Sequence, residues 1–119
     1  MGTFESALHK MLDVELPPTL PTGKTTMYAI AFDLDTAALQ QNYHNQSWQN
    51  AYATIGNILA RHGFNRQQGS VYFGNLGVDA VKCVLAVQDL SRQLPWFKPS
   101  VSDIRMLRIE ELNDLSIAL

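Results

Sequence analysis

Two aspartates at the end of one predicted strand have the clearest capacity for chemistry in this chain. Residues 27–36 read MYAIAFDLDT and alternate between large apolar side chains and small or acidic ones. The large face carries Tyr28, Ile30, Phe32 and Leu34. The opposite face carries Ala29, Ala31, Asp33 and Asp35. A carboxylate at the mouth of a buried strand can bind a metal ion, position a water molecule or act as a general base.

The same pattern has two other interpretations. Haloacid-dehalogenase phosphohydrolases also open on a strand ending Asp-x-Asp-x-Thr, in which the first Asp, here Asp33, attacks phosphate. That family needs a longer Rossmann-like domain with a later acidic pair, whereas 84 residues follow Asp35 (119 minus 35) and contain no adjacent aspartates. Alternatively, the aspartates cap the next helix. This fits Asp35 better than Asp33, which lies in register with the strand.

The composition indicates one soluble domain. With 119 residues, 46% of them hydrophobic, the chain can bury a sizeable core without cross-links. Its single cysteine, Cys83, allows no intrachain disulfide, so a reducing cytoplasm is expected. The net charge of −2 gives no general attraction for nucleic acid but leaves room for a local basic patch. No membrane span or signal peptide is apparent.

Residues 1–26 are predicted to be a flexible leader, and residues 27–119 to form the domain. The leader contains one short amphipathic segment, with Phe4, Leu8 and Leu12 four residues apart. Three prolines then fall within residues 17–21, where neither a regular helix nor a central strand can continue.

From Met27 onward, strand and helix patterns alternate. We expect a first helical turn with Thr36 as its N-cap, then a main helix capped by Ser47 and ended by Gly63 in a left-handed conformation. Residues 64–67 and 70–73 predict either a tight hairpin or one bent strand around Gly69.

A second helix, capped by Asp79 and stopped by Pro95, precedes a last strand at residues 104–109. Its buried side is expected to include Val81, Val84, Leu85, Val87 and Leu94. The order predicts a ferredoxin-like α+β sandwich, in which two main helices cover one face of an antiparallel sheet. The other face, with Ala29 and Ala31, is small enough for a second copy to approach, which predicts a homodimer with two Asp33 carboxylates in one cleft.

Three blocks of sequence together resemble one family: MYAIAFDLD at 27–35, QGSVY at 68–72, and WF at 96–97 followed by SVSDIR at 100–105. In this order and spacing, the chain resembles VapD over roughly residues 27–114. VapD proteins are ribonuclease toxins of bacterial toxin–antitoxin pairs, related to the small dimeric nuclease of CRISPR adaptation complexes. The resemblance implies a homodimeric endoribonuclease with a ferredoxin-like fold, an RNA substrate and a cognate antitoxin protein. The family's functional aspartate falls on Asp33.

RNA cleavage gives the polar residues defined candidate roles. Asp33 could take the proton of the RNA 2′-hydroxyl, or hold Mg²⁺ so that water attacks instead, and the cofactor stays open. His44 and Ser70 are candidate supporting residues. The candidate RNA-binding residues are Tyr43, Arg66, Lys98, Arg105 and Arg108. The competing functions are a non-catalytic dimeric scaffold and a small phosphohydrolase that uses Asp33.

The leader should be dispensable for folding, because every core-forming period begins at Tyr28. A chain that starts at Met27 should melt within about 4 °C of the full chain, equivalent to about 1 kcal/mol or less. Thermal unfolding followed by circular dichroism measures this, and a collapse in stability would contradict the boundary. If the leader docks over the Asp33 cleft, its removal should also raise RNA cleavage, whereas equal activity would identify a linker.

Overall fold

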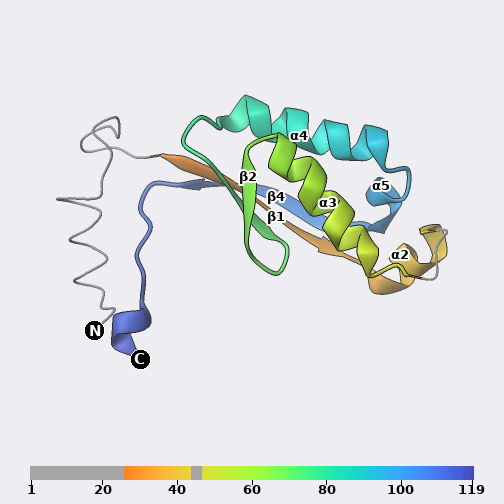
Figure 1. Cartoon of the computed structure of the whole chain (residues 1–119), viewed down its shortest axis with the longest axis horizontal. Helices are drawn as coiled ribbons and strands as arrows, with labels where there is room; N and C mark the ends of the chain where they lie inside the picture. Colours follow the sequence, from red (N-terminus) through yellow and green to blue (C-terminus); the bar gives the residue numbers. More distant parts are fainter. Residues whose placement is uncertain (1–25, 44–46) are drawn as a thin grey trace. The chain divides into compact units, whose positions relative to one another are not determined.

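A computed structural model describes residues 26–43 and 47–119 (Figure 1). All of the predicted leader except Thr26, and the candidate residue His44, lie outside the described residues. The elements in chain order are β1 (Met27–Leu34), α2 (Thr36–Asn42), α3 (Asn50–Arg61), β2 (Phe64–Gln68), β3 (Val71–Gly74), α4 (Ala80–Gln93), α5 (Phe97–Ser100), β4 (Val101–Ile109) and a 3-10 turn (Ser116–Ala118). Residues 27–109 form one compact unit, and residues 110–119 belong to another.

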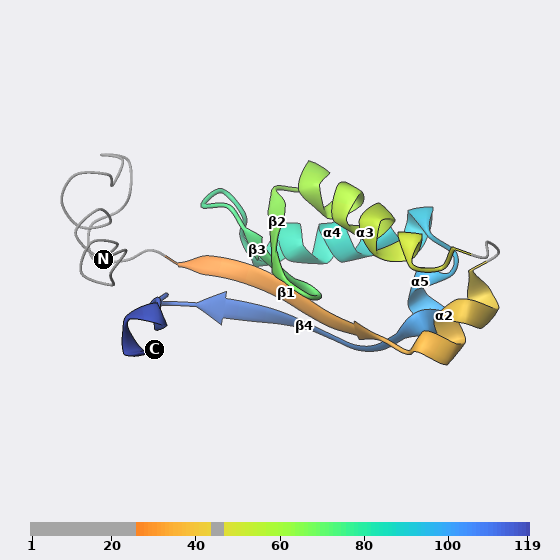
Figure 2. The same ribbon diagram turned by 60° about the horizontal axis from the view of Figure 1, so that its bottom comes forward.

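The compact unit is a four-stranded antiparallel sheet with strand order β2-β3-β1-β4. Figure 2 shows the two long helices, α3 and α4, on the same side of this sheet. The predicted ferredoxin-like arrangement is therefore confirmed. The phosphohydrolase alternative does not fit, since a Rossmann-like domain is built on a mostly parallel sheet. No described helix has the length and apolar character that a membrane span requires.

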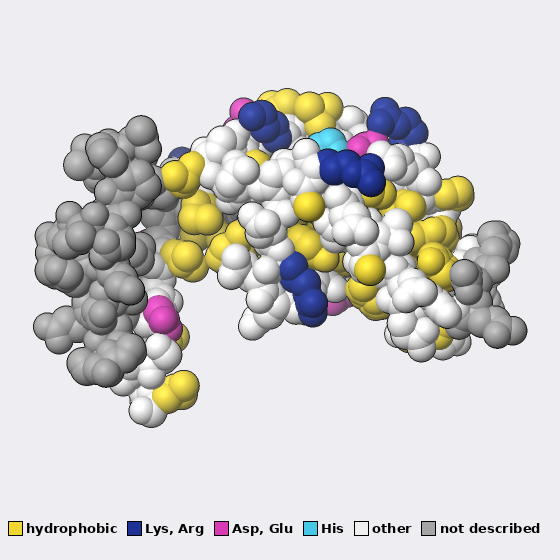
Figure 3. All heavy atoms as spheres, viewed as in Figure 1, with side chains coloured by type: hydrophobic (Ala, Val, Ile, Leu, Met, Phe, Trp, Pro, Cys, Tyr) yellow, Lys and Arg dark blue, Asp and Glu magenta, His cyan; other side chains and the backbone are white. Residues whose placement is uncertain are grey.

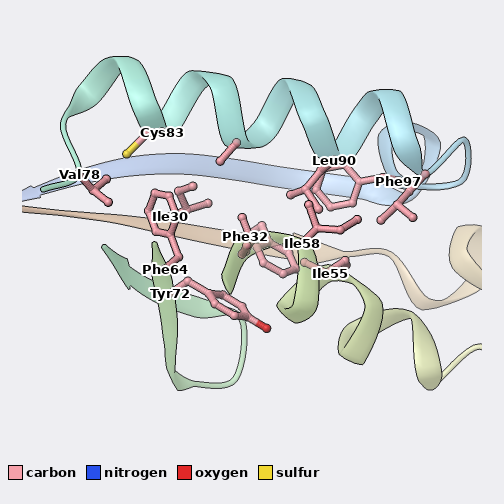
Figure 4. Close-up of a cluster of buried hydrophobic side chains, with 13 residues drawn as sticks. Ile30, Phe32, Ile55, Ile58, Phe64, Tyr72, Val78, Cys83, Leu90 and Phe97 are labelled. Atoms are coloured by element: carbon pink, nitrogen blue, oxygen red, sulfur yellow. The ribbon is translucent and has the colours of Figure 1, made fainter. Parts of the chain in front are cut away.

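The two faces of β1 differ as predicted, with large apolar residues on one face and small residues on the other. Ile30 and Phe32 are at most 4% exposed and lie in the core beneath the helices (Figure 4). The ring of Phe32 stacks on Tyr72 at a centroid distance of 6.0 Å and meets the edge of Phe97 at 6.1 Å. Burying one such aromatic side chain stabilises the fold by about 2–3 kcal/mol. On the opposite face, Ala29 is fully buried by its neighbours and Ala31 is half-buried.

Two predicted helix starts are wrong. The N-cap of α2 is Asp35 rather than Thr36, because the Asp35 carboxylate accepts a hydrogen bond from Ala38 N at 2.9 Å. This confirms the capping interpretation of Asp35. Helix α3 begins at Asn50, with Gln49 as N-cap and no side-chain capping bond there, because Ser47 to Gln49 form a turn that precedes it.

Glycines end α3 and close the hairpin as the sequence predicts. Gly63 follows α3 with φ of +89°, the left-handed conformation that a Cβ atom disfavours. Gly69 has φ of +49° and lies in the turn that joins β2 to β3. The alternative of a tight hairpin is thus confirmed over a single bent strand.

The predicted buried side of α4 is confirmed at Leu94, which is buried, and at Val87, which packs against the core, but it is wrong at three other positions. Cys83, Ala86 and Leu90 face the core, whereas Val81, Val84 and Leu85 are 65%, 52% and 51% exposed. Valine and leucine are common on both sides of this helix, so apolar periodicity alone does not identify the stripe that meets the sheet. The small side chains of Cys83 and Ala86 let the helix approach β1 closely.

A hydrogen-bonded pair joins the end of α3 to the middle of α4. Nε2 of His62 lies 2.7 Å from an Asp89 carboxylate oxygen, and the same carboxylate accepts bonds from Arg92 and Gln93. The hydrogen bond from His62, followed by that from Gln93, lowers the pKa of Asp89 from 3.8 to about 2. The folded state therefore binds the Asp89 proton less tightly than the unfolded chain does.

This pair predicts a defined pH dependence of stability. Since the Asp89 pKa is depressed on folding, its contribution is complete above pH 3.8 and disappears as the pH falls through about 2. Asp89→Asn should lower the free energy of unfolding at neutral pH, and the difference from wild type should shrink below pH 3.8. Denaturant titrations at several pH values measure this, with Glu111→Gln as the control. A difference that stays constant with pH would contradict the assignment.

Candidate active site

The end of β1 places two carboxylates opposite each other on the sheet face that α3 and α4 leave uncovered. Asp33 is exposed, and its register partner on β4 is Asp103, so the two side chains point to the same face. Directly opposite residues have Cβ atoms about 5 Å apart. Within the described chain, the Asp33 carboxylate makes no hydrogen bond or ion pair. It is therefore available to a ligand.

A β-bulge directly follows this pair. Asp33 pairs with Asp103, but the next residue, Leu34, pairs with Val101, so Ser102 is the extra residue on β4. The Ser102 hydroxyl donates to the Asp33 carbonyl oxygen at 3.2 Å. Bulges of this kind redirect side chains and often lie next to active sites.

A cation stands beside the two carboxylates. Nε of Arg105 donates to both carboxylate oxygens of Asp103, at 3.2 and 3.1 Å, and this contact raises the pKa of the guanidinium. Arg105 is the register partner of Ala31, so it lies on the same uncovered face as Asp33. It offsets part of the repulsion between the two carboxylates. The predicted RNA-binding residue Arg105 therefore lies on the face of Asp33 and contacts its register partner Asp103.

The β2–β3 turn lies beside the same end of β1. Phe32 N donates to Ser70 O at 3.1 Å, which places Ser70 one residue along the strand from Asp33. Arg66 reaches across the turn, and its Nε donates to Gly69 O at 2.9 Å. Two further predicted residues, Ser70 and Arg66, are thus brought to the Asp33 end of the sheet.

The remaining predicted residues are dispersed. Arg108 is the register partner of Tyr28, five residues or about 17 Å along the sheet from Asp33, and faces the other side. Tyr43 packs edge-on against Trp96 at 5.1 Å, and Lys98 is exposed on α5. Figure 3 shows the Lys and Arg side chains of one face standing apart rather than as one basic patch.

Sequence reasoning missed Asp103. It lies within the SVSDIR block that carries the resemblance, but its place opposite Asp33 is set by the register of β4 against β1, which runs without interruption from Met27 and Ile109 to Asp33 and Asp103. The bulge at Ser102 shifts the register only after this pair. Among residues 26–43 and 47–119, no group of three His, Cys, Asp or Glu side chains could hold a metal ion. One protomer therefore offers a pair of carboxylates.

Comparison with known proteins identifies relatives of this chain. The family model described as CRISPR associated protein Cas2 matches residues 26–116. Endoribonuclease VapD 2 of Riemerella anatipestifer is 52% identical over 93 residues, which cover 78% of this chain and 99% of that protein. An endoribonuclease VapD homolog of Helicobacter pylori is 50% identical over 93 residues, covering 78% and 96% respectively.

A third relative, endoribonuclease VapD of Haemophilus influenzae, is 45% identical over 92 residues, covering 76% of this chain and 94% of that protein. The matched region begins at the first strand and includes the acidic pair, the hairpin and both long helices. The chain therefore belongs to the VapD endoribonuclease family, within the wider group that the Cas2 model describes.

Proposed function

We propose that this protein is an endoribonuclease toxin in which Asp33 is the key acidic residue. The observation that carries the proposal is the exposed Asp33 carboxylate, which has no partner among the described residues and lies opposite Asp103 and beside Arg105. Relatives up to 52% identical that bear the name endoribonuclease VapD support RNA as the substrate.

Asp33 and Asp103 can have different roles in phosphodiester cleavage. RNA carries its own nucleophile, the 2′-hydroxyl, and Asp33 takes its proton as a general base. The 2′-oxygen bonds to phosphorus while the bond from phosphorus to the 5′-oxygen breaks. The leaving 5′-oxygen gains a proton from water, and the products are a 2′,3′-cyclic phosphate and a 5′-hydroxyl. Arg105 uses one edge of its guanidinium for Asp103, and its remaining N–H groups can meet the charge that develops on the phosphate. Asp103 thereby holds Arg105 in position.

Asp33 and Asp103 also suit a magnesium ion. Mg²⁺ prefers oxygen ligands and is often bound by one or two carboxylates together with water and substrate phosphate. When bound, it would supply a Lewis acid at the phosphate. Cleavage measured with and without EDTA separates this route from the metal-free one, and Asp33 is required in both.

The proposal includes a homodimer formed through the uncovered sheet face. Around Ala31, this face carries the half-buried Val71 and Phe73 and the 42% exposed Leu107. An apolar sheet face without helices needs a partner layer, and a second copy supplies one. Dimerisation would bring two acidic pairs into one interface.

A cognate antitoxin protein is the second proposed partner, and it follows from the VapD resemblance. The competing function is a dimeric scaffold without catalysis, which would bind its partners equally well without Asp33. Loss of activity on substitution of Asp33 separates the two functions.

Asp33→Asn should reduce RNA cleavage by about 100-fold or more, because general-base catalysis contributes about 10²–10⁴-fold. The change is nearly isosteric and removes charge and basicity alone, so fold and dimer should persist. Purified proteins and a labelled single-stranded RNA measure the rate, and expression of wild type but not of the variant should arrest growth.

Asp35→Asn is the matched control for this prediction. It removes a carboxylate two residues away, and asparagine caps helices as well as aspartate does, so its cleavage should stay close to wild type. Asp103→Asn should resemble Asp33→Asn. Wild-type rates in a folded Asp33→Asn protein would overturn the assignment.

Ala31→Arg should split the dimer, because it places an unpaired charge in the proposed interface. Such burial costs several kcal/mol, enough to raise the dimer dissociation constant about 100-fold. Sedimentation velocity measures the change. Ala60→Arg, at an exposed position of α3, should leave the dimer intact. A wild-type protein that is monomeric at micromolar concentration would refute the interface.

A further inference from the structure

A hollow beside the β2–β3 turn has no role in the chemistry assigned to Asp33. It has a volume of 430 Å³ and is lined by Tyr52, Ala53, Arg66, Gly69, Ser70 and Tyr72. We call it the hairpin pocket. Ligand sites in proteins commonly have volumes of about 300–1,000 Å³. The pocket is thus large enough for one nucleotide.

The lining has the chemistry of a nucleotide site. Among the described residues that line it, Arg66 alone is charged, in a protein whose net charge is −2. The Arg66 guanidinium uses Nε to bond Gly69 O, which orients the group and leaves its terminal N–H groups for an anion. The ring of Tyr52 is 36% exposed and offers a surface on which a base can stack.

Tyr72 supplies a polar group at the inner wall. Its ring belongs to the core, but its hydroxyl points away from the other labelled core side chains (Figure 4). Within residues 26–43 and 47–119, that hydroxyl makes no hydrogen bond. A Cβ atom at Gly56 would lie 3.0 Å from it, so glycine leaves it room. Burial raises the pKa of Tyr72, which keeps the hydroxyl protonated and able to donate.

The pocket lies next to the acidic pair along the sheet. Pairing of β1 with β3 extends to Ala31, and the bond from Phe32 N to Ser70 O follows it. At Asp33, β1 pairs with β4 along one edge, and no described strand pairs with it along the other edge, where β3 ends. The sheet is therefore open on the hairpin side of Asp33. An RNA strand bound at the Asp33 carboxylate would cross this edge of the sheet to reach the pocket, which Tyr52 and Tyr72 line on the helix-covered side.

We propose that the hairpin pocket binds one nucleotide of the RNA that Asp33 acts on, with an unpaired base against Tyr52 and a phosphate on Arg66. This proposal rests on the proposed RNA substrate and adds a binding site distinct from the acidic pair. Because an aromatic face and a single cation recognise any unpaired base with its phosphate, the pocket selects single-stranded over paired RNA.

Binding of RNA to the Asp33→Asn protein tests the pocket without cleavage. A short labelled single-stranded RNA is titrated by fluorescence anisotropy over a range of KCl concentrations. Tyr52→Leu should weaken binding about tenfold, because base stacking is lost, whereas Tyr52→Phe should retain it. Arg66→Gln should reduce the slope of log K against log salt by about 0.7, the value for one phosphate contact on a single strand.

Two controls separate charge from structure. Arg61→Gln removes an exposed arginine of α3 outside the pocket and should leave the salt slope unchanged. Arg66→Lys keeps the charge but changes the bond to Gly69, so a retained slope identifies the phosphate contact rather than the turn. Circular dichroism establishes that each variant is folded.

The outcomes distinguish the two proposals. If Tyr52→Leu and Arg66→Gln bind as tightly as the parent, or Arg61→Gln loses as much, the hairpin pocket is refuted while cleavage by Asp33 stands. If the wild-type protein cleaves no RNA but the pocket variants lose binding as expected, the proposed enzyme function fails. The pocket then remains as a site for single-stranded RNA.

Discussion

The alternation of side chains along β1 determines which of its residues enter the core and which lie on the uncovered face of the sheet. β1 is hydrogen-bonded to β3 on one side and β4 on the other, and its apolar face anchors Ile30 and Phe32 in the core. A slip by one residue would expose Phe32, at a cost of about 2 kcal/mol, and would bury the Asp33 carboxylate, at several more. The register is therefore strongly specified. Because successive side chains point to opposite faces and Phe32 packs into the core, Asp33 lies exposed on the uncovered face.

The order of helices and strands along the chain and the two glycine turns could be predicted because they depend on local signals. Period-two alternation identified β1, and Gly63 and Gly69 marked the two backbone positions that need positive φ. The start of α3 and the full buried side of α4 could not be predicted from the sequence. Serine often caps helices, but Ser47 lies in a turn that precedes α3. Val81 and Val84 are as apolar as Cys83, so hydrophobicity does not show which of them faces the core. Asp103 was missed for a tertiary reason, because its place opposite Asp33 depends on the register between two strands that lie far apart in the sequence.

The distribution of charged side chains limits how this acidic protein can bind a polyanion such as RNA. With a net charge of −2 and dispersed cations, this chain exerts little long-range attraction, and salt screens charges beyond about 8 Å at physiological ionic strength. Binding must then come from short-range contacts. Arg105 and Arg66 suit that role because each is oriented by an acceptor, Asp103 and Gly69 O respectively. A guanidinium held in place loses less conformational entropy when it meets a phosphate.

The acidic pair is a feature that stability alone would not select. Like charges directly opposite in a sheet repel, and an apolar pair at Asp33 and Asp103 would extend the surface formed by Ala31 and Leu107. The sequence instead places two carboxylates where that surface ends, next to a bulge and an open sheet edge. Local conflicts with the fold of this kind concentrate at functional sites. A partner layer on the apolar part of the face would exclude water from one side of the pair and strengthen each electrostatic contact there. The proposed catalysis and the proposed dimer therefore depend on the same face of β1.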